Sequence, residues 1–171
     1  MSNGDTKTDF PKTSGVFITC WTEDPNHREN VLKTTAGGNS HVTLFYCGDD
    51  SISGANPREV AAKIIFELPR RAKIVGCHVN SFLNRKTGKT RNDILMDLDP
   101  ETMNWIETLR KETLGDAYSA DGIFMGKPHV TYAIDLPDIE TLGETCKKLQ
   151  KLITENPENS IPIVLNGVTL D

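Results

Sequence analysis

The tripeptide His-Val-Thr occurs twice in the sequence, at residues 41–43 and again at residues 129–131. If each copy lies in a β-strand, alternation puts its His and Thr on one face, about 6.5 Å apart, and its Val on the other. Two such strands side by side would gather two imidazoles and two hydroxyls around one small site. The other two histidines, His27 and His78, have no Thr two residues later.

This set of side chains suits the cleavage of a phosphodiester. A neutral imidazole can take a proton from the attacking oxygen, and a protonated one can give a proton to the leaving oxygen, because the ordinary pKa of histidine is about 6.5. Threonine hydroxyls can donate hydrogen bonds to the non-bridging oxygens. We therefore expect His41 and His129 to be catalytic and Thr43 and Thr131 to bind phosphate, with no metal ion and no other cofactor.

The surroundings of the two tripeptides repeat as well. Each begins an apolar strand, which is followed by a helix and then by a second strand. His41 precedes Ile74 by 33 residues, and His129 precedes Ile163 by 34 residues. The matched spacing predicts an internal duplication of a strand–helix–strand unit. A pseudo-two-fold axis between the two units would bring the two histidine strands to one shared cleft.

The remaining periodicities complete the expected set of elements. Pro57 favours the start of a helix, since proline fits the first helical position. A polar turn at 85–92 between two apolar runs predicts a hairpin. A weak helical stretch is expected near 28–34. Strands are expected at 15–22, 41–47, 72–83, 93–98, 129–134 and 161–170, and further helices from 99 or 100 to about 114 and at 138–154.

Length and charge restrict the class of protein. A chain of 171 residues is enough for one domain, and we expect that domain at 14–171 after a flexible N-terminal tail at 1–13. The net charge of −5 argues against binding long nucleic acid but not against a nucleotide or short oligonucleotide in a local pocket. No apolar run approaches a membrane span, and 1–13 does not resemble a signal peptide, so we expect a cytoplasmic protein without membrane partners.

The four cysteines and the remaining histidines lack the spacing of zinc ligands, so we interpret the cysteines as buried free thiols in a reducing compartment. Trp21, at the end of the first strand, is a candidate platform for stacking a base. Phe124, in the loop before the second tripeptide, could line the cleft, and Lys127 could add positive charge to the phosphate site. His78 is expected to be hydrogen-bonded or to form part of the cleft wall.

The paired segments HVTL (41–44) and HVTY (129–132) resemble the signature of the two-histidine (2H) phosphoesterase superfamily, two H-x-[ST]-x motifs. The resemblance extends from Gly15 to the end of the chain. It implies an α+β fold of two pseudo-symmetric lobes, with antiparallel sheets that line a central cleft and helices outside. It also implies that the two histidines are the catalytic acid and base. Members of the superfamily process cyclic phosphates, 2′–5′ oligoadenylates, RNA ends and cyclic oligonucleotide signals, and some viral and phage members destroy defence nucleotides.

Two other functions compete with a phosphodiesterase. A nucleotide- or RNA-binding module could keep the same cleft without turnover. An RNA 2′–5′ ligase would run the reverse reaction, although its RNA-end binding fits poorly with the acidic net charge. Base preference, the linkage cleaved and the roles of the two histidines are left open by the sequence.

Overall fold

The computed structural model describes residues 14–32, 40–47, 57–83, 87–114, 127–133 and 138–170. The predicted tail at 1–13 lies outside these ranges. The six strands within them are β1 (Ser14–Trp21), β2 (His41–Cys47), β3 (Arg70–Leu83), β4 (Thr90–Leu98), β5 (His129–Ala133) and β6 (Ile161–Leu170).

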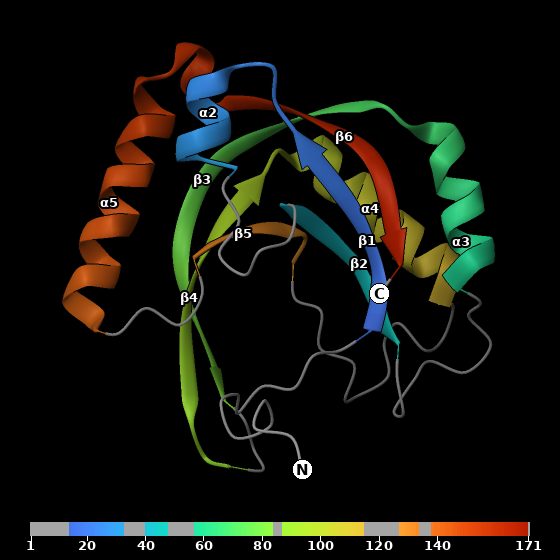
Figure 1. The fold of residues 1–171 in the computed structure, drawn as a ribbon, viewed down its shortest axis with the longest axis horizontal. Coiled ribbons are helices and arrows are strands. Elements are labelled where there is room, and N and C mark those ends of the chain that lie inside the picture. The colour runs from blue at the N-terminus through green and yellow to red at the C-terminus, as the bar shows by residue number, and fades with distance from the viewer. Residues whose placement is uncertain are drawn as a thin grey trace.

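The strands close into one antiparallel barrel in the order β1-β2-β5-β4-β3-β6 (Figure 1). The α+β class and the antiparallel pairing are therefore as predicted. Two lobes with separate sheets are not found, because β3 pairs with β6 and β2 pairs with β5, which joins the two halves at both edges. The strand order reads the same when β1, β2 and β3 are exchanged with β4, β5 and β6, and it agrees with a duplicated unit.

The helices lie outside the ring of strands (Figure 1). Three of the α-helices in the described ranges begin at a proline, and one of these starts is Pro57, which the sequence predicted. The short helix expected near 28–34 lies earlier, because the Asp24 carboxylate accepts hydrogen bonds from the first backbone N–H groups. No helix in the described ranges is long and apolar enough to cross a bilayer. The α-helices are α2 (Pro25–Asn30), α3 (Pro57–Ile64), α4 (Pro100–Leu114) and α5 (Ile139–Glu155), and the 3₁₀ turns are η1 (Ile65–Glu67) and η3 (Pro157–Asn159).

The hydrophobic core lies between the outer surface of the barrel and these helices. Val42 and Val130, the central residues of the two tripeptides, are fully buried there with Ile106 of α4 and Ile153 of α5. Burial of the valines fixes the side of the barrel on which their neighbours lie, since successive side chains alternate. The His and Thr side chains therefore project from the opposite, inner face.

The three cysteines whose side chains the structure describes have free thiols, as expected, but of these three only Cys20 is buried. Cys77 of β3 and Cys146 of α5 are half-buried, with their Sγ atoms 3.6 Å apart. Burial, the neighbouring Cys146 thiol and the Asp97 charge raise the pKa of Cys77 to about 12. This thiol is therefore a packing group at neutral pH and a poor nucleophile.

Candidate active site

The two His-Val-Thr strands are direct neighbours in the barrel. Strand β2 pairs antiparallel with β5, and Val42 lies opposite Val130. An antiparallel register centred on this pair sets His41 across from Thr131 and Thr43 across from His129. Cross-strand neighbours have Cβ atoms about 5 Å apart, and diagonal neighbours about 7–8 Å. The pairing therefore brings the four predicted site residues together on one face, as the repeat suggested.

Each of the two strands carries a β-bulge at the residue that follows its threonine. Against β1, the register shifts at Leu44, because Thr43 pairs with Phe17 whereas Phe45 pairs with Val16. Against β4, the register of β5 shifts at Tyr132. A bulge locally increases the twist and re-aims neighbouring side chains. Both motifs thus end in the same local distortion, on the side away from the partner motif.

The bulge in β2 is held by a buried arginine. Arg110 of α4 is 1% exposed, and its Nε and Nη2 donate to the carbonyl oxygens of Leu44 and Thr43, each at 2.7 Å. A bulge disrupts the ladder that would normally satisfy these carbonyls. The guanidinium suits this task because its N–H groups form a rigid planar fork. Arg110 therefore fixes the backbone that carries Thr43.

His129 has a defined tautomer and a lowered pKa. Its Nδ1 lies 2.8 Å from the Lys127 carbonyl oxygen, which can only accept, so Nδ1 carries the proton. Burial lowers the pKa of His129 most; the bond to Lys127 opposes this, and the charges of Arg110, His78 and His41 add to the lowering. At neutral pH the ring is therefore neutral, with the lone pair on Nε2.

His41 occupies a different environment from His129. It is exposed, and its ring meets the edge of Phe17 with the two centroids 4.9 Å apart. Phe17 lies on the neighbouring strand β1, opposite Thr43. The aromatic contact restricts the orientation of the imidazole and leaves it accessible to solvent. The two histidines thus differ in burial although they stand in equivalent positions of the repeat.

The three residues predicted to bind substrate have different outcomes. Trp21 is 39% exposed on the same side of β1 as Phe17, and the Arg28 guanidinium lies 5.2 Å from its ring centroid. Lys127 is exposed, and its carbonyl oxygen, not its ammonium group, is what contacts His129. Phe124 lies outside the described residues. A stacking role for Trp21 stays a prediction.

Sequence reasoning missed Arg110 and Asp97. Asp97 of β4 lies directly across from His129, and its Oδ1 is 2.8 Å from Nδ1 of His78 on β3. His78 is therefore hydrogen-bonded, as expected, but to a carboxylate on the inner face. The signal for Asp97 was its strand position alone. Arg110 could have been suspected, because Thr102, Ile106 and Arg110 share one buried stripe of α4.

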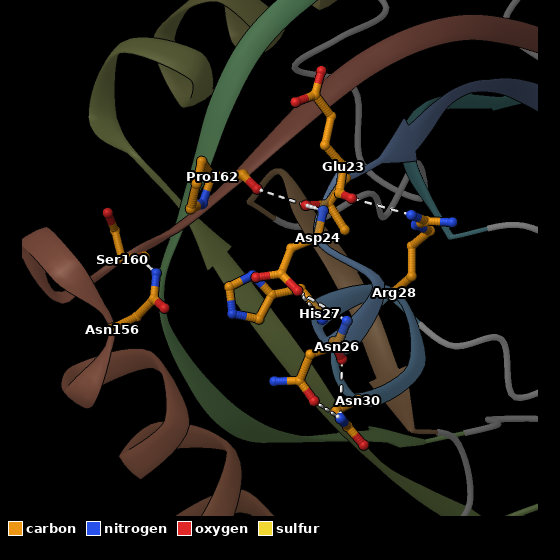
Figure 2. A network of polar contacts seen from close by, with 10 residues as sticks. Glu23, Asp24, Asn26, His27, Arg28, Asn30, Asn156, Ser160 and Pro162 are labelled. Atoms are coloured by element: carbon orange, nitrogen blue, oxygen red, sulfur yellow. Dashed lines mark hydrogen bonds and ion pairs between the residues drawn. The ribbon is translucent and has the colours of Figure 1, made fainter.

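A hollow lies away from the motif residues. It has a volume of about 1120 Å³ and lies between α2, the start of β3, β6 and η3. Figure 2 shows the polar network beside it, in which Arg28 donates to the Glu23 carbonyl oxygen and Asn156 donates to that of Ser160. Five acidic and three basic side chains line this hollow, so its excess of negative charge disfavours an anionic ligand.

Among the described residues, no group of three or more His, Cys, Asp or Glu side chains is arranged to hold a metal ion. Comparison of the chain with models of known protein families finds no match. Comparison with curated proteins finds no match either.

Proposed function

We propose that this protein is a phosphodiesterase of the two-histidine type that cleaves a nucleotide phosphodiester. The supporting observation is the pairing of β2 with β5 around Val42 and Val130, which gathers two imidazoles and two threonine side chains on one face. The family resemblance of the paired motifs supports the same chemistry. The 2H phosphoesterase fold, which the resemblance also implies, is part of this proposal as well.

The environments of the two histidines suggest their roles. Neutral His129 takes the proton of the attacking hydroxyl on Nε2, because its Nδ1 proton is held by the Lys127 carbonyl oxygen. The attacking oxygen bonds to phosphorus, and the bond between phosphorus and the leaving oxygen breaks. Protonated His41 gives its proton to that oxygen. If the attacker is a ribose hydroxyl, the product is a cyclic phosphate; if it is water, the product is a monoester.

The two threonines would act on the phosphate. The hydroxyls of Thr43 and Thr131 donate to the non-bridging oxygens, where negative charge grows in the transition state. Thr43 is 8% exposed, so its hydrogen bond is formed where water competes little. Its removal should cost about 10-fold to 10²-fold in kcat/KM.

The test is turnover, with excess chelator, on 2′,3′-cyclic mononucleotides, 2′–5′ oligoadenylate and cyclic di- and trinucleotides. His41→Ala and His129→Ala should each lose at least the 10²-fold typical of a general acid or base. Ser81→Ala, on the outer face of β3, is the matched control and should keep the wild-type rate. Full activity in either histidine variant refutes the scheme. Binding of one nucleotide without turnover would instead indicate a nucleotide- or RNA-binding module. Joining of RNA ends would indicate an RNA 2′–5′ ligase.

A further inference from the structure

The His78–Asp97 pair extends the polar inner face beyond the four motif residues. The two side chains are 51% and 40% exposed, and His78 lies on β3, the second strand beyond β5. Asp97 of β4 pairs with His129 of β5. Leu95 of β4 lies between His78 of β3 and Thr131 of β5 and pairs with both. Two strand spacings of about 4.8 Å place the His78 backbone about 10 Å from that of Thr131.

The local backbone accommodates this pair. A Cβ atom at Gly76, directly across from Asp97, would lie 3.2 Å from Asp97 Oδ2, which is tighter than an ordinary contact. The absence of a side chain at Gly76 therefore leaves room for the carboxylate. The carboxylate in turn accepts the Nδ1 proton of His78 and orients the ring. The His78 side chain is 51% exposed, and no described residue hydrogen-bonds its Nε2.

Beyond the buried Leu95, the inner face carries polar side chains again along the β3–β4 hairpin. Asn80 lies across from Asp93, and Arg91 donates to both carboxylate oxygens of Asp93 through Nε and Nη2. On the opposite flank of the motif strands, β1 carries Trp21 at its exposed end. The polar and aromatic surface therefore extends to both sides of the two motif strands, over more than the width of a single phosphate.

We propose that His78, oriented by Asp97, is a specificity-determining residue that contacts a second nucleotide unit of the substrate. The inference rests on the proposed phosphodiesterase and defines its substrate class as an oligonucleotide, linear or cyclic, in preference to a mononucleotide cyclic phosphate. Neutral His78 accepts a hydrogen bond on Nε2 from a ribose hydroxyl, and protonated His78 donates one to a phosphate oxygen.

The experiment compares one-unit and two-unit substrates. Values of kcat and KM are measured for 2′,3′-cyclic adenosine monophosphate, for the 2′–5′ and 3′–5′ adenylate dimers and for a cyclic adenylate dimer. The variants are His78→Gln and Asp97→Asn, with Ser81→Ala as control, because the Ser81 hydroxyl also forms a β3–β4 cross-strand hydrogen bond, to Asn92. Equilibrium binding of each dimer is measured in parallel.

The preference for a dimer is the ratio of kcat/KM for the best dimer to kcat/KM for the monomer. We expect His78→Gln to lower this ratio about 10-fold, mainly by raising KM for the dimer, because one hydrogen bond to the substrate is lost. Asp97→Asn should change the ratio in the same direction, and Ser81→Ala should leave it unchanged. Equal losses on monomer and dimer, or a loss confined to kcat with a shifted pH profile, would overturn the inference and assign the pair to His129.

Binding separates this inference from the proposed function. If wild type cleaves no substrate, the phosphodiesterase fails, but the dimer affinities still test the subsite. A dimer Kd that rises about 10-fold in His78→Gln supports the second-nucleotide contact. A dimer Kd equal to that of wild type, or no measurable binding of any dimer to wild type, refutes it.

Discussion

Replacement of Arg110 by Met tests whether the guanidinium stabilises the bulged motif strand. Methionine keeps much of the side-chain volume but leaves the carbonyl oxygens of Thr43 and Leu44 without their donor. Each buried group left unsatisfied costs about 1–3 kcal/mol, so the two together cost about 2–6 kcal/mol. Removal of a buried cation also releases its desolvation cost, which offsets part of this sum. We expect a net loss of about 2–3 kcal/mol in the free energy of unfolding.

The assay is urea unfolding followed by circular dichroism, with Arg28→Met as the matched control. Arg28 also donates to a backbone carbonyl oxygen, that of Glu23 at 3.1 Å, but it is exposed and should contribute less than about 1 kcal/mol. Total stabilities of about 5–15 kcal/mol leave the Arg110 variant enough folded protein to measure. If the two variants lose equal stability, the buried hydrogen bonds of Arg110 do not stabilise the motif strand.

The same variant has a second readout at the active site. The Arg110 charge is one of the causes that lower the pKa of His129. Its removal should raise that pKa toward the ordinary value, measured by NMR titration of the His129 ring protons. A purely mechanical role for Arg110 would destabilise the fold without this shift. An unchanged His129 pKa would therefore show that the Arg110 charge does not act on His129.

Two further predictions follow from titrating groups. Burial lowers the pKa of His129, so the acidic limb of the kcat/KM profile should have its midpoint below the ordinary histidine value of about 6.5. The free energy of unfolding should also fall as the pH drops through about 6.5, because the unfolded chain takes up the proton at a higher pH than the folded protein does. His129→Gln should remove this part of the stability change. Burial raises the pKa of Asp99, but hydrogen bonds from Thr102 and Lys73 outweigh it and the pKa lies below its usual value. Asp99→Ala should therefore lower the free energy of unfolding by about 1 kcal/mol at neutral pH, as for the loss of a helix cap. The loss should be much smaller in acid, where the wild-type carboxylate is itself protonated. Equal losses at both pH values, measured by urea unfolding, would contradict this prediction.

The sequence was sufficient to locate the motif strands because their pattern is local. His and Thr two residues apart, with an apolar residue between them, specify a strand with one polar face, and the repeat specifies two of them. The long helix at 100–114 and the last strand at 161–170 were likewise predicted, since Pro100 and a β-branched run mark them. What these patterns lack is long-range information, because periodicity does not say which strand edges meet.

The closure of the barrel and the supporting contacts depend on such long-range pairings. His78 and Asp97 are 19 residues apart in the chain and meet only through the β3–β4 register. Arg110 contacts a strand 66 residues earlier, and no local rule links the two segments. A charged residue on the buried stripe of a helix was the one available signal. It indicates a partner in the core without identifying it.

The bulges explain why strict alternation fails just after each threonine. In a regular strand, Phe45 would lie on the inner face beside His41 and Thr43. In the structure Leu44 and Phe45 are both fully buried in the helix-side core, since the extra residue in β2 turns Phe45 to that face. Tyr132 occupies the equivalent bulge in β5 and is 8% exposed, also in the core. After the fourth residue of each motif, the strand therefore no longer places polar side chains on the inner face. Because the site is built from two copies of the motif, the bulge occurs in both strands.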